Sequence, residues 1–545
     1  MAAASSTAVE RDLVNQFHHS LDMAMQMNED RDLAADEPLS ISMLPEALIG
    51  EILSNLSDAR DLAKAALVNS SFRRSSAYVK YVSHICRLKN ILKPPGEASV
   101  HVVPFKETLL NVVNNLKCVE RLRFEIEDDV QANRFKEDVL EKNSLWLSEG
   151  PYLEKWLPRV GDTLQHLTLI DYGQQAIFQT TPLLQLLSVH CKQLRHLELR
   201  NMFLNTNDCG KFNKLDTLNL RCVKLLENGL QDINECMPKL ETVTLVTVVG
   251  LKRAVFKSAC LKVLCLGLAT KVTAVKLHVP ILHKLQLKMA CPDELKVFAP
   301  GLLALALSMN KRNDAVIEFE GVNKLKELLM GASEISTLKK LSLANRTLER
   351  VFLDVPCLHF DDTGKFKGVR NPSPTALPLM EDIITCCATL QVMSVGPGLW
   401  YALEQDMSSR AGITYPKWSS MKQLILHLVV ENAELSYGLL ARLVTAMVDT
   451  LHTLEVYVHK DSKVGPECFL RLHQEFPSIW PASLKDRAKI EVVLQVSFLG
   501  EYGIWLRPLL MMEAQGQITL FDRREMKRYL SGQCPLIVVD LGEKS

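Results

Sequence analysis

One short pattern, L-x-x-L-x-L, returns along the chain and constrains its fold more than any other feature. Successive clear copies from position 164 to position 302 begin 30, 21, 25, 21, 21 and 20 residues apart. So regular a spacing predicts repeated units that stack on one another, each with a short strand whose alternate residues point inward. The clear copies begin at Leu164, Leu194, Leu215, Leu240, Leu261, Leu282, Leu302, Leu338 and Leu451, and looser copies begin at Leu325, Leu390 and Met421.

The length of each unit predicts what connects its strand to the next one. The 30-residue unit has room for a helix at 182–191 before the strand at 194–199. Units of 20 or 21 residues are too short for a strand and a stable helix, so we expect extended segments at 272–279 and 294–298. A helix is expected again at 435–449. The array should therefore curve unevenly.

Charge and composition exclude several classes of protein. The 545 residues include 63 Lys and Arg and 63 Asp and Glu, so no net charge draws the chain to nucleic acid or to an anionic membrane. We find no apolar run of roughly 18 residues, the length that a membrane-spanning helix needs. The first residues lack the basic and apolar pattern of a targeting segment, so cytoplasm and/or nucleus is the expected location.

Fourteen cysteines are scattered through the chain without a CxxC pair or a Cys/His spacing typical of zinc ligands. No metal and no cofactor are therefore expected, and a reducing compartment is favoured over a disulfide framework. Several cysteines precede a predicted strand and are interpreted as small buried hydrophobic residues. These are Cys191, Cys236, Cys260, Cys357 and Cys387.

Two short amphipathic helices are predicted near the start of the chain. A proline at the first helical turn, Pro45, is followed by apolar residues at helical spacing up to Leu56, and Asp61 is a candidate cap for a second helix. Helices this short leave more apolar surface than they can cover themselves, which predicts a partner protein on one face. The alternative is a helical hairpin that packs on its own chain.

Residues 44–74, LPEALIGEILSNLSDARDLAKAALVNSSFRR, resemble an F-box. The resemblance implies that these helices dock on a Skp adaptor, and through it on cullin and RING subunits. Phe72 departs from the family pattern, which often has Trp there, so this contact should be weaker. Adaptor contact is carried over to Leu44, Pro45, Leu48, Ile52, Leu53, Leu62, Leu67, Val68 and Phe72.

The phrases SACLKVLCL, VPILHKLQL and APGLLALAL are similar to the irregular repeats of plant F-box proteins with leucine-rich repeats. The expected fold class is α/β, with a small N-terminal helical F-box, an irregular leucine-rich-repeat solenoid shaped as a horseshoe, and a C-terminal cap. The expected domains are a mobile leader at 1–39, the F-box at 40–89, a connector at 90–158, the repeats at 159–460 and the cap at 461–545.

Residues that lie between the leucines of each strand should face the concave side of the array. They include cationic and polar side chains that suit an acidic or phosphorylated segment of a target protein. The alternative is a solvated strand face. The candidate substrate-binding residues are His196, Glu198, Arg200, Arg221, Lys284 and Lys288.

Motifs of catalysis are missing from the sequence, which has no P-loop, HExxH, nucleophile elbow or dinucleotide fingerprint. The resemblance implies a non-catalytic substrate receptor of an SCF-type ubiquitin ligase, which binds an unknown substrate protein and neither nucleic acid nor membrane. The alternative is a leucine-rich-repeat interaction scaffold outside any ligase. A third class, a receptor for a small molecule, has no specific residue to support it.

Overall fold

A large parallel sheet organises the computed structural model, which describes residues 44–56, 58–88, 91, 104–133, 135, 144–309, 315–330 and shorter stretches between 337 and 491. Sixteen described strands form this sheet, and every neighbouring pair in it is parallel. In spatial order they are β1 (Tyr81–Cys86), β2 (Arg121–Ile126), β3 (His166–Ile170), β5 (His196–Leu204), β6 (Thr217–Leu225), β7 (Thr242–Val248), β9 (Val263–Leu268), β11 (Lys284–Lys288), β13 (Ala304–Ser308), β15 (Glu327–Met330), β16 (Arg350–Leu353), β19 (Val392–Val395), β20 (Gln423–Leu428), β21 (Thr453–Val458) and β22 (Lys489–Glu491), while β4 (Thr180–Thr181) pairs with β5.

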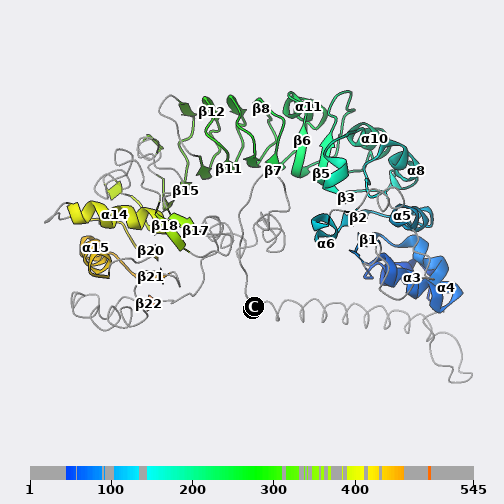
Figure 1. Cartoon of the computed structure of the whole chain (residues 1–545), viewed down its shortest axis with the longest axis horizontal. Helices are drawn as coiled ribbons and strands as arrows, with labels where there is room; N and C mark the ends of the chain where they lie inside the picture. Colours follow the sequence, from blue (N-terminus) through cyan, green and yellow to red (C-terminus); the bar gives the residue numbers. More distant parts are fainter. Residues whose placement is uncertain are drawn as a thin grey trace, which may run out of the picture.

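The repeated leucines form the core because the register aligns them from strand to strand. Leu197 of β5 pairs with Leu218 of β6, and Leu199 pairs with Leu220. All four are buried, whereas the residues between them are more exposed. Alternate residues of a strand point to opposite faces, so one face of the sheet packs on the outer layer and the other forms the inner side of the arc in Figure 1.

The outer layer changes from helices to strands and back along the arc (Figure 1). Helices α5 (Phe105–Asn114), α8 (Gly150–Val160), α10 (Leu183–His190) and α11 (Gly229–Cys236) cover the first units. The shorter units carry a second parallel sheet of β8 (Arg253–Lys257), β10 (Ala274–His278), β12 (Glu294–Phe298) and β14 (Val316–Glu320). Helices α14 (Pro397–Ser409) and α15 (Ala433–Ala446) follow.

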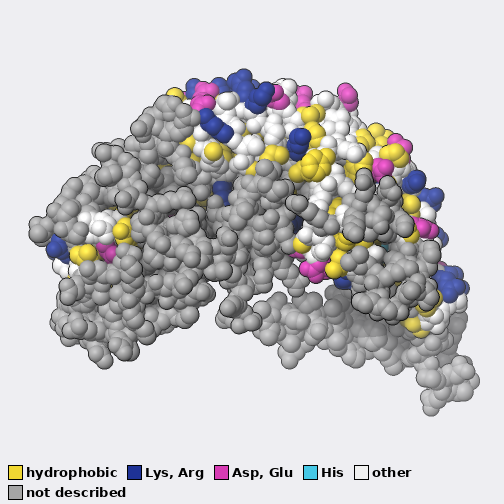
Figure 2. Space-filling view, in the orientation of Figure 1, with side chains coloured by type: hydrophobic (Ala, Val, Ile, Leu, Met, Phe, Trp, Pro, Cys, Tyr) yellow, Lys and Arg dark blue, Asp and Glu magenta, His cyan; other side chains and the backbone are white. Residues whose placement is uncertain are grey.

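Unit length explains this change of the outer layer. The predicted helices at 182–191 and 435–449 are confirmed as α10 and α15, and the predicted extended segments are confirmed as β10 and β12. Figure 2 shows both signs of charge along the outer surface there, and the second sheet carries ion pairs such as Lys276–Glu294 at 2.8 Å. The result is a mixed α/β fold on a parallel sheet, consistent with a leucine-rich-repeat type of fold.

The parallel sheet begins earlier than the sequence predicts. Strand β1 lies in the range assigned to the F-box, and β2 lies in the range assigned to a connector. Both follow the repeat spacing with other residues in place of leucine: β2 has Val119, Leu122 and Phe124, and β1 has Val79, Val82 and His84. The pattern was missed because only one of these six inward positions is a leucine.

The prediction of a strand at the repeat copy that begins at Leu338 is wrong. Leu338 itself lies outside the described residues, but Lys340 and Leu341 close to it are helical. The next strand after β15 is β16, which pairs with it through Glu327 and Arg350. A run such as LKKLSL fits a helix as well as a strand, so periodicity alone cannot separate the two.

Several predictions fall wholly or mainly outside the described residues. The leader at 1–39 lies outside them, and so does the cap at 461–545 except for β22. Among the cysteines expected to be buried, Cys191 and Cys236 are confirmed and Cys260 is half-exposed. Cys357 and Cys387 lie outside the described residues.

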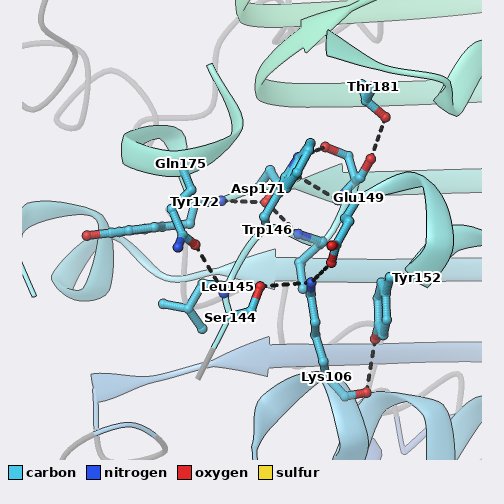
Figure 3. A network of polar contacts seen from close by, with 12 residues as sticks. Lys106, Ser144, Leu145, Trp146, Glu149, Tyr152, Asp171, Tyr172, Gln175 and Thr181 are labelled. Atoms are coloured by element: carbon cyan, nitrogen blue, oxygen red, sulfur yellow. Dashed lines mark hydrogen bonds and ion pairs between the residues drawn. The ribbon is translucent and has the colours of Figure 1, made fainter. Parts of the chain in front are cut away.

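A network of polar contacts holds residues 144–149 against the first strands (Figure 3). The buried carboxylate of Asp171 accepts three backbone N–H groups, from Leu147, Ser148 and Tyr172, each at 2.8 Å. The Leu145 N–H donates to Gln175 Oε1 at 3.1 Å. Residues 144–149 form no regular strand or helix, so Asp171 supplies hydrogen-bond acceptors that backbone carbonyls would supply there.

His84 makes the first strand sensitive to acid. It is buried at an inward position of β1 and stacks on Phe105 with ring centroids 4.7 Å apart. Burial, with the nearby charge of Arg60, lowers the pKa of His84 from 6.5 to about 4. The unfolded chain therefore takes up this proton first as the pH falls, so the contribution of His84 to stability is complete above pH 6.5 and is lost on the way to pH 4.

Replacing His84 with phenylalanine should remove this acid sensitivity. The free energy of unfolding of the His84→Phe chain relative to the unchanged chain should rise by about 2 kcal/mol between pH 7.5 and pH 4.5. Burial raises the pKa of Asp171 from 3.8 to about 6, which works in the opposite direction, but both chains contain Asp171 and the difference removes it. Urea unfolding at the two pH values measures the effect, and a constant difference would contradict it.

Candidate functional site

Three short helices precede the sheet: α2 (Glu46–Leu53), α3 (Ala59–Val68) and α4 (Ser70–Ser75). Side chains cap two of them, since Asp58 accepts from the Arg60 N–H at 2.9 Å and Asn69 accepts from the Phe72 N–H at 2.8 Å. The cap of the second helix is thus Asp58 and not the predicted Asp61, which lies in the first turn and bonds Lys64. Capping fixes where each short helix begins.

Large apolar side chains of these helices face outward. Leu67 is 75% exposed and Val68 is 68% exposed at the end of α3, and Leu48 of α2 is also exposed. Pro45, directly before α2, is exposed too. We call Pro45, Leu48, Leu67 and Val68 the exposed apolar residues of the helices. Such side chains on a helix pair are the feature expected of a surface that another protein covers.

Two of the predicted adaptor contacts are core residues instead. Leu53 is 3% exposed and Leu62 is 6% exposed, and both pack into the chain's own hydrophobic core. Their assignment as outward contacts is therefore corrected, because a side chain buried in its own chain has no free face for a partner. Leu44, Ile52 and Phe72 are half-buried, so part of each remains accessible.

The helices are attached to the first strand of the sheet. Arg60 Nη2 donates to the carbonyl of Ile85 in β1 at 3.1 Å, and the Lys80 N–H before β1 donates to Ser54 Oγ at 2.9 Å. Gly50 packs so closely on Tyr78 that a Cβ would lie 2.9 Å from the Tyr78 Cβ. The helices and the sheet are therefore packed as one unit.

Four of the six predicted substrate-binding residues lie together on the inner face. His196, Glu198 and Arg200 alternate along β5, and Arg200 pairs in register with Arg221 of β6. Both arginines are buried, at 6% and 5% exposed, and Arg221 Nε donates to Asn219 Oδ1 at 3.1 Å. Burial lowers the pKa of His196. Adjacent guanidinium groups in a buried setting concentrate positive charge at one point of the sheet.

Lys284 and Lys288 lie at the two ends of β11, three strands beyond β6. Cys265 of β9 lies between the two groups of cations because β9 lies between β6 and β11 in the sheet. Burial raises the pKa of Cys265 to about 12, and the charges of Arg221 and Lys288 oppose this rise. The predicted residues therefore form two groups on the inner face, one at β5 and β6 and one at β11, separated by the uncharged strands β7 and β9.

A row of left-handed backbone residues crosses three neighbouring strands and was not predicted. Asn201, Cys222 and Thr247 have φ angles of 60°, 50° and 54°. Each directly follows a residue of one register row, Arg200, Arg221 or Val246. Thr247 is β-branched, so its conformation is strained. Only Asn201 is a residue type that favours this region, so the amino-acid types hardly indicate the row.

No family model matches the chain. A curated F-box/LRR-repeat protein of Arabidopsis thaliana is 25% identical to it over 391 residues, which cover 70% of this chain and 82% of that protein. An alignment of this length includes the middle of the chain with its repeats as well as one or both flanks. This similarity supports membership of the F-box/LRR-repeat family.

F-box/LRR-repeat proteins generally act in SCF ubiquitin ligases as non-catalytic substrate receptors, and the F-box generally binds a Skp-type adaptor. Two observations on the described residues accompany this membership. They include no group of three or more His, Cys, Asp or Glu side chains that could hold a metal ion. Among them, too, no helix is both long and apolar enough to span a bilayer.

Proposed function

We propose that this F-box/LRR-repeat protein is the substrate-recognition subunit of an SCF-type ubiquitin ligase. Helices α2, α3 and α4 act as the F-box and bind the Skp adaptor, and through it the cullin and RING subunits. The sheet acts as a leucine-rich-repeat horseshoe whose inner face binds the target protein. The proposal depends above all on one observation, the exposed side chains of Leu67 and Val68 on a helix already fixed to β1.

The proposed mechanism is proximity. The chain holds an adaptor at one end and a target on the inner face, so that a separate conjugating enzyme transfers ubiquitin to a protein held near it. No bond is made or broken by the chain itself. The proposed site of action is the cytoplasm and/or nucleus, where the chain would bind the adaptor and, through it, the cullin.

The cations of the inner face support a target with an acidic or phosphorylated segment. Lys284 and Lys288 of β11 are half-exposed, so their ammonium groups are accessible to carboxylate or phosphate groups of a target. Arg200 and Arg221 are buried, so they contribute positive charge at β5 and β6 rather than direct contacts. Neighbouring Glu198 accepts a hydrogen bond from Thr168 at 3.4 Å and adds selectivity against uniformly acidic ligands.

Adaptor binding tests the proposal. In copurification from cells, the full chain should recover a Skp adaptor and a cullin, and a Leu67→Asp, Val68→Asp chain should recover at least tenfold less. Two exposed apolar contacts at the centre of an interface commonly supply roughly 2 kcal/mol or more. Both positions are exposed, so the substitutions leave the core intact, as unchanged circular dichroism would verify.

The control is Val189→Asp, which places one aspartate at an exposed apolar position of α10 and should leave recovery unchanged. Full recovery of the adaptor by the Leu67→Asp, Val68→Asp chain would contradict the proposal. That outcome would favour the scaffold function, which the packing of Leu53 and Leu62 into the core also suits, since helices that merely cover the first strand need no adaptor.

A further inference from the structure

Two cysteines from different units come together on the helical side of the sheet. Cys209 lies in the loop between β5 and β6, and Cys236 is the last residue of α11. The loop is attached to α11 on both sides of Cys209. Thr206 Oγ1 donates to Asp232 Oδ2 at 2.5 Å, and the Phe212 N–H donates to the Cys236 carbonyl at 2.7 Å.

The two thiols lie within hydrogen-bonding reach of each other. The hydrogen bond with Cys209 lowers the pKa of Cys236, and the same bond with burial raises the pKa of Cys209. One proton is therefore lost more readily than the other, and the remaining proton is shared between the sulfurs. Cys209 is half-exposed, whereas Cys236 is buried. The residue before Cys209, Asp208, has a left-handed φ of 57°, which turns the loop at this point.

We propose that Cys209 and Cys236 form a redox-sensitive dithiol that a hydroperoxide converts to a disulfide. The proposal is independent of the ubiquitin-ligase function. It departs from the interpretation of Cys236 as packing alone, because a buried thiol that only fills space needs no second thiol beside it.

The reaction begins at Cys209, the sulfur that solvent reaches. In the singly deprotonated pair the shared proton rests mainly on Cys209, the thiol with the raised pKa. When this proton passes to Cys236, the Cys209 thiolate attacks the peroxide oxygen and the O–O bond breaks; the departing oxygen takes a proton from solvent and leaves as an alcohol or water. The resulting sulfenic acid is then attacked by the Cys236 sulfur. The S–O bond breaks, the hydroxide leaves as water with the last thiol proton, and the S–S bond forms. Both thiols are oxidised and one hydroperoxide is reduced.

The disulfide would link two successive units across the loop. It closes a segment of the chain that contains β6 and α11, so it restricts the unfolded chain and stabilises this part of the fold. The thermal unfolding midpoint of the oxidised protein should rise by a few degrees, roughly, and return on reduction.

The test uses the reduced full-length protein treated with hydrogen peroxide, followed by alkylation of free thiols and peptide mapping without reduction. The expected result is one dominant crosslinked peptide pair, Cys209 with Cys236, which dithiothreitol reverses. Peroxide treatment in urea should lose this preference, because the pairing depends on the fold. Sulfinic or sulfonic acid at Cys209 without the crosslink would overturn the proposal, as would disulfides spread over other cysteines.

Two variants sharpen the result. Cys209→Ser should abolish both the crosslink and the rise in the thermal midpoint on oxidation. Cys265→Ser, at a buried thiol near Gln286 on another part of the sheet, should keep both. Retention of the thermal shift in the Cys209→Ser protein would show that another oxidation causes it and would overturn the assignment.

Discussion

Replacing Asp171 with alanine is expected to lower the free energy of unfolding by on the order of 4 kcal/mol. The substitution leaves three buried N–H groups, those of Leu147, Ser148 and Tyr172, without their acceptor. Each buried donor without a partner costs about 1–3 kcal/mol. Residues 144–149 would lose the two hydrogen bonds that join Leu147 and Ser148 to Asp171, so the loss should appear as local opening before global unfolding.

Asp171→Asn is the matched control because it keeps the size of the side chain and one acceptor oxygen. That oxygen can still serve Leu147 and Tyr172, which both donate to Oδ1, while the amide group faces the Ser148 N–H. The asparagine chain should therefore lose roughly a third to a half as much stability. Urea unfolding measures both variants, and amide hydrogen exchange at residues 144–149 locates the opening. An alanine variant as stable as the unchanged chain would show that Asp171 is not the anchor.

Replacing Gly250 with alanine should cost about 3 kcal/mol or more. Gly250 follows β7 with a φ of 95°, a conformation that side chains rarely adopt, and its Cβ would overlap the backbone carbonyl oxygen of Leu225. That carbonyl belongs to a chain segment held by the bond from the Leu225 N–H to the Val249 carbonyl at 3.0 Å. The backbone cannot move aside without breaking the pairing of β6 with this turn, so strain and a lost hydrogen bond add together.

Gly321→Ala separates the two causes. Gly321 also has a positive φ, 72°, but its nearest neighbours to a Cβ are side-chain atoms at 3.4 Å or more. The Gly321→Ala substitution should therefore lower the free energy of unfolding by only about 1 kcal/mol, which reflects the backbone conformation alone. Thermal unfolding of the two variants side by side measures the difference. Equal losses at both positions would show that the overlap with Leu225 is relieved.

Much of the fold follows from the leucine positions. A leucine at each position that points into the core determines how neighbouring strands align and which side of each strand is buried. Unit length correctly predicted the change from α10 to β10 and back to α15. The sequence failed where the inward residues change type. His84 and Phe124 occupy leucine positions in β1 and β2, and only burial in the folded chain identifies them as equivalent.

The sequence predicted which apolar residues belong to the candidate adaptor surface, but not which of them point outward. On short helices such as α2 and α3, apolar residues serve either the chain's own core or a partner, and spacing does not distinguish the two. Leu53 and Leu62 pack into the chain's own core, whereas Leu67 and Val68 are exposed. For the candidate substrate-binding residues, alternation along a strand indicates directly which side chains point to the inner face.

Because the helices are bonded to β1, position along the sheet becomes a measure of distance. Neighbouring strands are about 4.8 Å apart, so β6 lies four steps, about 19 Å, from β1 along the arc, and β11 lies seven steps, about 34 Å, away. A target protein bound at β6 and one bound at β11 would thus lie at different distances from a protein bound to the helices. The strand at which a target protein binds therefore determines which residues of that target lie close to a protein bound to the helices.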